Sequence, residues 1–127
     1  MTISQIEKIF KSYELMLDFF GMHLKDRKTG ELERAVNWRQ QYTHLNDHFH
    51  NCLRITRMLK FFDEVGLGYL QSPLVKFVLH EIFDNHELAT CLDSCVKYWS
   101  QVIRNDKERS EVEEYINKHY KPTDWVP

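Results

Sequence analysis

Apolar side chains recur at steps of three and four residues along most of this chain, and this spacing constrains the fold more than any other feature. Four glycines and three prolines in 127 residues leave little turn chemistry for many short strands. A chain of this length buries about two thirds of its unfolded surface without disulfides or metals. We therefore expect an all-α fold, a compact single-domain bundle of about six helices over residues 1–120, followed by a tail at 121–127.

The first predicted helix runs from Ser4 to Gly21. Ser4 and Glu7 have the spacing of a capping box, and glycine commonly follows the last turn of a helix. Leu15 and Phe19 fall on the side opposite the apolar stripe. We therefore expect this helix to make a contact besides the main core.

Helical spacing predicts further helices before and after the middle of the chain. The polar stretch 25–31 is interpreted as an exposed loop, and a helix is predicted over residues 31–42. Ser72 begins another helix, with a proline in its first turn, and apolar positions match the helical template over residues 88–103. Ser110 and the glutamate three residues later form another possible capping box. No stretch favours a strand.

The middle of the chain is expected to form the best-buried helix, over residues 47–65. Asn46 or Asp47 can cap its start, and Gly66 follows its end. At about 100° per residue, its apolar side chains spread over one broad side. The other side carries His50, Arg54, Arg57, Lys60 and Glu64.

Charge and composition disfavour several kinds of partner. The 17 basic and 19 acidic residues are spread along the chain, and the net charge of -2 offers no field that attracts phosphate backbones or anionic lipid. No run of about 18 apolar residues exists, and charged residues interrupt the N-terminal segment, so neither membrane insertion nor a signal peptide is expected. Three cysteines cannot all pair, which favours reduced thiols and an intracellular protein.

Histidines gather around the predicted start of the middle helix. Within one helix, His48 and His50 would differ by about 200° and point to nearly opposite sides, so they are not expected to share an ion. Only His44 and His48 are spaced to pair, and a third ligand would have to come from His80 or His86. No established zinc spacing supports such a site. We predict no metal site and no cofactor.

Catalytic patterns are missing from the sequence. Cys91 and Cys95 lie one helical turn apart and are interpreted as small apolar fillers of the core. The sequence has no nucleophile elbow, no phosphate-binding loop and no dinucleotide fingerprint. An enzyme is therefore disfavoured.

The polar side of the middle helix permits two interpretations. Arg54, Arg57 and Lys60 could form the basic stripe of a nucleic-acid-reading helix, but Asp63 and Glu64 close that stripe. A solvated face whose arginines pair with carboxylates of neighbouring helices is favoured. An arginine fork also suits recognition of a partner's carboxylate. The candidate residues for holding a carboxylate or a backbone segment of a partner are His50, Asn51, Arg54 and Arg57.

Two stretches resemble the shared domain of the opioid growth factor receptor family. They are "KSYELMLDFFGMHLKDRKTGELERA" (residues 11–35) and "HNCLRITRMLKFFDEVGLGYLQSPLVKFVLHE" (residues 50–81), of which the "HN-x-LRITR" pattern is the more specific. With the weaker "WRQQYTHLN" and "YWSQVIRNDKERSEV", the resemblance covers residues 10–115.

This resemblance implies a mostly helical domain without catalytic chemistry. It also implies binding of an enkephalin-type pentapeptide, restraint of cell proliferation, and a cytoplasmic, nuclear or perinuclear location. The sequence lacks the aromatic segment that usually precedes the family's first helix and the hydrophilic C-terminal extensions, so we expect either a fragment or a minimal relative. Leu15 and Phe19 mark where the missing segment would pack.

We therefore predict a non-enzymatic domain that binds a peptide ligand or a protein partner. The alternative is a structural or assembly module of a receptor-like paralogue with no opioid ligand. The predicted state is a monomer or a weak homo-oligomer, with no nucleic-acid partner.

Overall fold

The computed structural model describes residues 1–48 and 50–119. In chain order the elements are α1 (Ile3–Phe19), β1 (Met22–Leu24), β2 (Leu32–Arg34), α2 (Trp38–Asp47), α3 (His50–Glu64), η1 (Gly68–Leu70), α4 (Gln71–Phe83), η2 (Ala89–Cys91), α5 (Leu92–Ser94), η3 (Cys95–Trp99), α6 (Ser100–Val102) and α7 (Asp106–His119). α5, the π-helical turn η3 and α6 follow one another without interruption and form one rod. The all-α prediction is confirmed, with one small sheet added to it.

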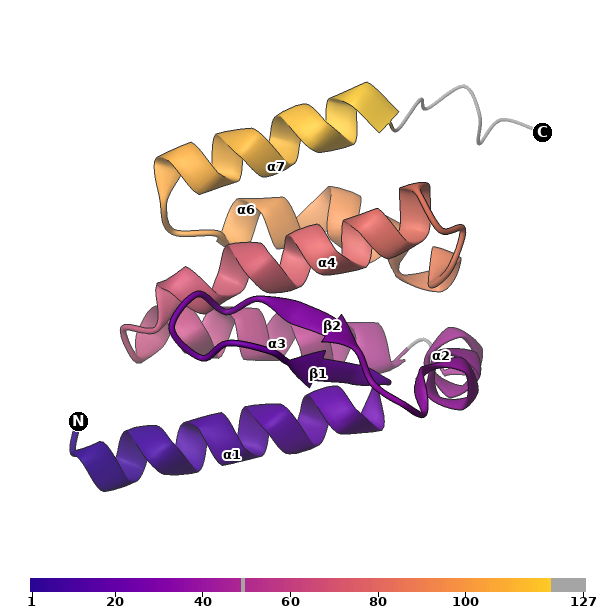
Figure 1. Cartoon of the computed structure of the whole chain (residues 1–127). Helices are drawn as coiled ribbons and strands as arrows, with labels where there is room; N and C mark the ends of the chain where they lie inside the picture. The colour runs from indigo at the N-terminus through magenta and orange to yellow at the C-terminus, as the bar shows by residue number, and fades with distance from the viewer. Residues whose placement is uncertain (49, 120–127) are drawn as a thin grey trace.

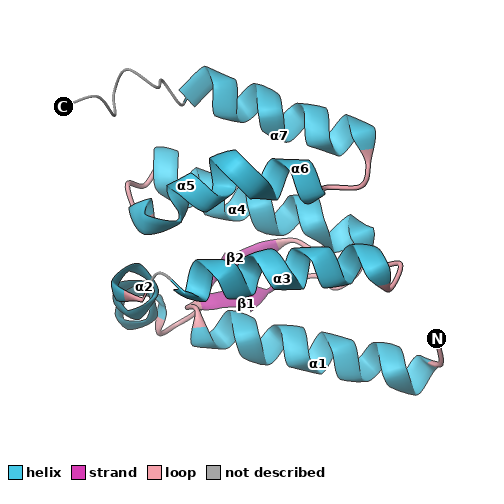
Figure 2. Ribbon diagram, turned by 180° about the vertical axis from the view of Figure 1, so that it is seen from behind, coloured by secondary structure: helices cyan, strands magenta, loops and turns pink. Residues whose placement is uncertain are grey.

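The long helices lie one above another in Figure 1, with α1 at the bottom, α7 at the top, and α3 and α4 between them. In that view the β1–β2 hairpin lies in front of α3, α1 lies below α3, and α4 lies above α3 and below α7. Figure 2, seen from behind, brings α3 and the α5–α6 rod to the front. α2 stands at one end of the stack in both views.

One hydrophobic cluster joins these elements, from Phe10 in α1 to Ile116 in α7. The ring of Tyr13 meets Phe62 edge on, with centroids 4.8 Å apart, which fixes α1 against α3. Trp99 is fully buried. The three cysteines are free thiols buried in this core, in agreement with the expected filler role.

The best-buried helix is α4 rather than α3, which corrects the expectation. α4 buries residues on nearly every side because the hairpin, α7, α3 and the rod all contact it. Glu81 lies among its buried positions, and so does Gln71 at its first turn. α3 keeps one long side uncovered.

The N-terminal cap of α1 lies two residues earlier than predicted. Thr2, rather than Ser4, forms the capping box: its Oγ1 accepts the Gln5 N–H, and Gln5 Oε1 accepts the Thr2 N–H. The helix ends before Gly21, as predicted, where φ is +83°. Leu15 and Phe19 are 73% and 52% exposed, on the side away from the core.

The loop predicted at 25–31 is confirmed, but the helix predicted over 31–42 is wrong over its first residues. β1 and β2 form an antiparallel hairpin, in which Met22 pairs with Arg34 and Leu24 with Leu32. The buried and exposed positions alternate along β1, as a strand lying on a core requires. α2 begins only at Trp38.

Three later helix boundaries also differ from the predicted ones. α4 starts at Gln71 with Pro73 in its first turn, close to the prediction from Ser72. The rod is preceded by the 3-10 turn η2. α7 starts at Asp106, where Asn105 Oδ1 accepts the Glu108 N–H, so the capping box predicted at Ser110 is wrong and the charged stretch forms the first turns of the helix.

No helix in the described ranges, 1–48 and 50–119, has the length and apolar character needed to cross a membrane. The tail predicted at 121–127 lies outside the described residues.

Candidate ligand-binding groove

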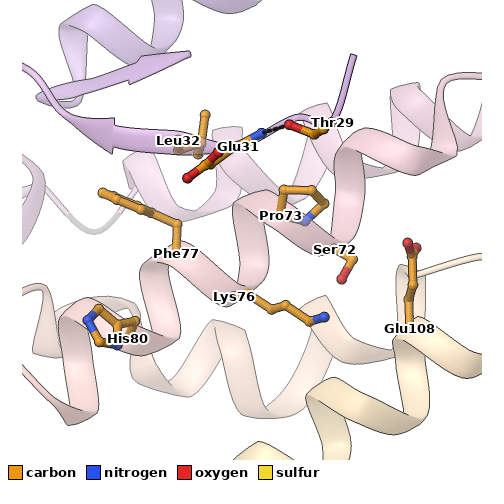
Figure 3. Close-up of a pocket in the computed structure, with 9 residues that line it drawn as sticks. All are labelled: Thr29, Glu31, Leu32, Ser72, Pro73, Lys76, Phe77, His80 and Glu108. Carbon is orange, nitrogen blue, oxygen red and sulfur yellow. Dashed lines mark hydrogen bonds between the residues drawn. The ribbon is translucent and has the colours of Figure 1, made fainter. Parts of the chain in front are cut away.

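Two adjoining pockets follow the outer side of α4. The first, about 390 Å³, lies between the hairpin and α4 and reaches Glu108 of α7, and the second, about 290 Å³, lies between α4 and α7. Both are lined by Lys76 and His80, so we treat them as one groove, the α4 groove. Its lining residues are Thr29, Glu31, Leu32, Ser72, Pro73, Lys76, Phe77, His80, Glu108, Glu111 and Tyr115. Figure 3 shows the first pocket, with the hairpin above α4.

The hairpin forms one wall of the groove because its tip is held on three sides. Arg27 donates to Glu7 at 2.7 Å and to Glu14 at 2.5 Å, both on α1. The Tyr69 hydroxyl donates to the Arg27 carbonyl at 2.7 Å. Gly30 has φ +79°, and a Cβ there would lie 3.0 Å from Pro73, so only glycine lets the tip approach α4 this closely. The wall is therefore fixed in place.

A buried ion pair holds the base of that hairpin against α4. Glu81, only 2% exposed, accepts from Arg34 Nε at 2.8 Å and from the Tyr42 hydroxyl at 2.5 Å. Burial raises the pKa of Glu81, but the hydrogen bonds from Arg34, Tyr42 and Asn85 outweigh it and hold the pKa below its ordinary value. Glu81 therefore stays ionised and joins β2, α2 and α4.

α7 supplies the opposite wall, and its charges are partly neutralised. Lys76 Nζ lies 2.7 Å from Glu111 Oε2, and that hydrogen bond lowers the pKa of Glu111. The Tyr115 hydroxyl donates to Asp84 at 3.0 Å, and burial together with this bond raises the pKa of Tyr115 to about 12. His80 also pairs with Asp84 through its Nδ1. Lys76, His80 and Tyr115 are therefore each engaged by a carboxylate.

Glu108 differs from the other carboxylates of the groove. Its side chain has no cationic partner among the described residues, whereas Glu31 lies 3.7 Å from Lys25 and Glu111 pairs with Lys76. The groove places this carboxylate within the same pocket as the apolar surface of Leu32, Pro73 and Phe77 (Figure 3). A cationic group and an aromatic or aliphatic group on one ligand would match this arrangement.

The described lining of the groove offers binding chemistry rather than catalytic chemistry. No nucleophile–base pair is found among these described residues: Ser72 is buried without a hydrogen bond to a base, and His80 is engaged by Asp84. A third pocket, about 520 Å³, lies at the ends of α3 and α6. Both of its arginines are paired, since Arg104 lies 3.3 Å from Asp63 and Arg109 pairs with Asp106.

The four residues predicted as a site lie on α3, outside the α4 groove. His50, Arg54 and Arg57 are exposed on the uncovered side of the helix. Asn51 is 3% exposed, and its Oδ1 has no hydrogen-bond partner in the part of the chain that the structure describes. The structure therefore brings three of the four to one surface and separates Asn51 from them.

The pairing expected for these arginines is wrong. Neither Arg54 nor Arg57 forms an ion pair or hydrogen bond with any described residue. The groove was missed because the two walls beside α4 come from a hairpin that was not predicted and from α7, whose start was placed too late. The sequence feature that could have indicated the groove is the spacing of Lys76 and His80, which lie one helical turn apart beside the apolar Phe77.

The expected separation of the histidines is also wrong. The rings of His48 and His50 have centroids 5.8 Å apart, and those of His44 and His48 are 6.3 Å apart. The reason is that α2 ends at Asp47 and α3 begins at His50, so His48 lies between two helices rather than within one. No cluster of three or more potential ligands is found among the described residues.

Comparison with known proteins gives one family. The model described as the "Opioid growth factor receptor (OGFr) conserved region" matches residues 2–126. The opioid growth factor receptor-like protein 1 of Rattus norvegicus is 41% identical over 129 residues, covering 99% of this chain and 28% of that protein. The opioid growth factor receptor of the same species is 42% identical over 116 residues, covering 91% and 20%.

The human opioid growth factor receptor is 39% identical over 116 residues, covering 91% of this chain and 17% of that protein. This chain thus spans less than a third of the length of these relatives. No solved structure matches it. The match to the family model covers nearly the whole sequence, so the chain belongs to the opioid growth factor receptor family.

Proposed function

We propose that this chain is a non-enzymatic peptide-binding domain and that the α4 groove is its binding site. The observation that carries the proposal is the unpaired carboxylate of Glu108 in one pocket with the apolar side chains of Leu32 and Phe77. The names of the relatives, receptors of an opioid growth factor, favour a peptide as the ligand.

An enkephalin-type pentapeptide has the groups that such a groove recognises. It carries a free amine and aromatic side chains, and an amine pairs with a carboxylate while an aromatic ring buries itself on apolar surface. The larger part of the groove, about 390 Å³, lies at the lower end of the range of about 300–1,000 Å³ typical of ligand pockets, and the smaller part, about 290 Å³, lies just below that range. We place the amine at Glu108 and an aromatic ring beside Phe77.

Isothermal titration calorimetry with an enkephalin-type pentapeptide tests this assignment. We expect binding to the wild-type protein, and Glu108→Gln to weaken it at least fivefold because the amine loses its counter-charge. Glu114→Gln, an exposed carboxylate elsewhere on α7, is the matched control and should leave the affinity unchanged. N-acetylation of the peptide should weaken binding to the wild-type protein and have little further effect on the Glu108→Gln variant.

Two outcomes would reject the assignment. If no heat appears at about 1 mM peptide, the groove has no useful affinity for this ligand. If the peptide binds but Glu108→Gln and Glu114→Gln behave alike, the amine is not held at Glu108. Circular dichroism of each variant establishes that the protein has remained folded.

We also propose that the protein acts inside the cell, in the cytoplasm or at the nucleus, and restrains growth, as the family resemblance implies. Expression of a fluorescent fusion in cultured cells tests both points. A wild-type fusion should slow proliferation and a Glu108→Gln fusion should not. Equal growth with both fusions, or export of the protein from the cell, would contradict this role.

The second candidate function is assembly with another chain, and it rests on α1. Ile3, Leu15 and Phe19 are 88%, 73% and 52% exposed, which is unusual for large apolar side chains on one helix. Sedimentation velocity separates the candidates. Concentration-dependent association that disappears in a Leu15→Ser/Phe19→Ser variant would support assembly through α1, and a monomer at all concentrations would remove support for self-assembly.

A further inference from the structure

Two arginines of this protein are left without the contacts that the others make. The chain has seven arginines. Ion pairs involve Arg27, Arg34, Arg104 and Arg109, and Arg39 lies over the ring of Trp38 at 5.1 Å. Arg54 and Arg57, both on α3 and both exposed, have neither kind of contact with the described residues.

The sequence of α3 leaves these arginines unpaired. No acidic residue occurs between positions 50 and 62, so neither arginine has a carboxylate one helical turn away. Instead Arg54, Arg57 and Lys60 follow one another at three-residue steps, where like charges repel and destabilise a helix. Nothing in the described fold compensates for this repulsion. A charge arrangement that opposes folding points to a role outside folding.

Exposed apolar side chains lie on the same side of α3. At about 100° per residue, Leu53, Arg54, Arg57, Lys60 and Phe61 fall within about 120° of one another around the helix. Leu53 is 41% exposed and Phe61 38% exposed. We name these five residues the α3 ridge. α3 lies behind the hairpin in Figure 1 and in front of it in Figure 2, so its uncovered side faces away from the hairpin wall of the α4 groove.

We propose that the α3 ridge docks an acidic, amphipathic segment of a partner protein. Each planar guanidinium can donate two hydrogen bonds to one carboxylate, and Arg54 and Arg57 stand about 4.5 Å apart along the helix axis, from a rise of about 1.5 Å per residue. A helical segment with acidic residues three or four positions apart presents its carboxylates at a matching interval. The apolar residues of that segment then cover Leu53 and Phe61, as an amphipathic helix does when its apolar side binds to a hydrophobic surface.

A nucleic acid fits this surface less well. A phosphate backbone has no apolar groups for Leu53 and Phe61, and Asp63 with Glu64 at the end of α3 would repel it. The net charge of -2 adds no long-range attraction. The proposal does not depend on the peptide-binding groove, because no residue of the ridge other than Lys60 lines any of the pockets described above.

Fluorescence anisotropy with a labelled synthetic helical peptide tests the proposal. The probe carries glutamates three and four residues apart on one side and leucines beside them, and a second probe has glutamine in place of each glutamate. We expect the acidic probe to bind at least tenfold more tightly than the glutamine probe. Arg54→Gln/Arg57→Gln should weaken binding of the acidic probe at least tenfold, and Leu53→Ser/Phe61→Ser should weaken it by a smaller factor.

The control is Lys8→Gln/Lys11→Gln, which removes two exposed cations with the same three-residue spacing from α1. It changes the net charge equally and should leave the affinity within twofold of the wild-type value. Equal losses in both double variants would show a general charge effect and overturn the proposal. No binding of the acidic probe, or tighter binding of a labelled DNA duplex, would also overturn it. All substituted residues are exposed or partly exposed, and circular dichroism checks that each variant is folded.

Discussion

Glu81 is the residue on which the placement of the hairpin depends most. It is buried in α4, yet it is charged, and its partners Arg34 and Tyr42 come from β2 and α2. A buried charge is tolerated only when hydrogen bonds replace its lost hydration. Arg34 is held a second time, since its guanidinium lies 3.8 Å from the centre of the Trp38 ring.

We expect Glu81→Gln to destabilise the protein by about 3 kcal/mol at pH 7, because it leaves Arg34 half-buried without its counter-charge. The pKa of Glu81 is lowered in the folded state, so its contribution is present above its ordinary value of 4.5 and is lost as the pH falls through the folded pKa. Urea unfolding at several pH values measures this. The difference between wild type and variant should shrink steadily below pH 4.5, and a constant difference would contradict the assignment.

Gln71 is a second buried polar residue whose role is to join chain segments. Its Nε2 donates to the carbonyls of Leu59 and Val102, each at 2.8 Å, and its Oε1 accepts the Arg104 N–H at 3.0 Å. These bonds tie the first turn of α4 to α3 and to the end of the α5–α6 rod. Three backbone groups therefore depend on one amide.

We expect Gln71→Leu to lower the free energy of unfolding by about 3 kcal/mol, because it leaves three backbone groups without their partner in a buried place. Thermal and urea unfolding followed by circular dichroism measure the change. Gln101→Leu, an exposed glutamine on α6, is the control and should change stability by less than about 0.5 kcal/mol. A similar loss in both variants would show that the buried network is not the cause.

At the level of elements, the hairpin shows how much the fold depends on one glycine. Gly30 has a positive φ, and its position against Pro73 and Leu70 leaves no space for a side chain. We expect Gly30→Ala to cost about 2 kcal/mol, from the strained backbone together with the clash. The hairpin tip should then move away from α4 and weaken peptide binding in the groove.

Hydrogen exchange followed by mass spectrometry measures that movement. Faster exchange in residues 22–34 of Gly30→Ala, with unchanged exchange in α7, would agree with a local loosening. Gly66→Ala is a control for backbone strain alone, since its φ is +80° and a Cβ there has no atom within 4 Å. If both variants lose the same stability, the contact between the hairpin and Pro73 contributes nothing.

The same elements show which parts of the fold could be predicted from sequence. Long amphipathic helices such as α1 and α4 were predictable because many residues repeat the same spacing. The hairpin was not, because its strands have three residues each, too few for alternation to stand out. Its stability comes from distant partners, Glu81 above all.

A break between α2 and α3 was predicted, but at residues 43–46, before its position between Asp47 and His50. His44 to His50 have no glycine or proline to mark an end, and the pattern continues across the boundary. The errors in these elements also made the prediction of the candidate site incomplete. Polar residues on α3 could be selected from sequence, but the α4 groove needs the hairpin and α7 to be placed correctly, and Glu108 belongs to a turn that was not predicted as helical.

At the level of the whole molecule, two surfaces of different chemistry lie on opposite sides of one core. The α4 groove offers an unpaired carboxylate beside apolar side chains, and the α3 ridge offers unpaired arginines beside apolar side chains. α3 and α4 contact each other, and Gln71 of α4, which belongs to neither surface, donates to the Leu59 carbonyl of α3. The residues that shape the groove, Glu81 and Gly30 among them, make no contact with the ridge.

This arrangement predicts that the two surfaces bind independently. Coupling between sites requires that one ligand change the equilibrium between two states of the protein, and a close-packed single core with no shared residue offers no such pair of states. The Kd of the pentapeptide, measured by calorimetry, should therefore agree within twofold with and without a saturating concentration of the acidic helical probe. Because coupling is reciprocal, the affinity of the acidic probe should be equally insensitive to the pentapeptide. A change of fivefold or more in either experiment would mean that α3 moves when the groove is occupied, and the Gly30→Ala variant would then be expected to bind the acidic probe differently as well.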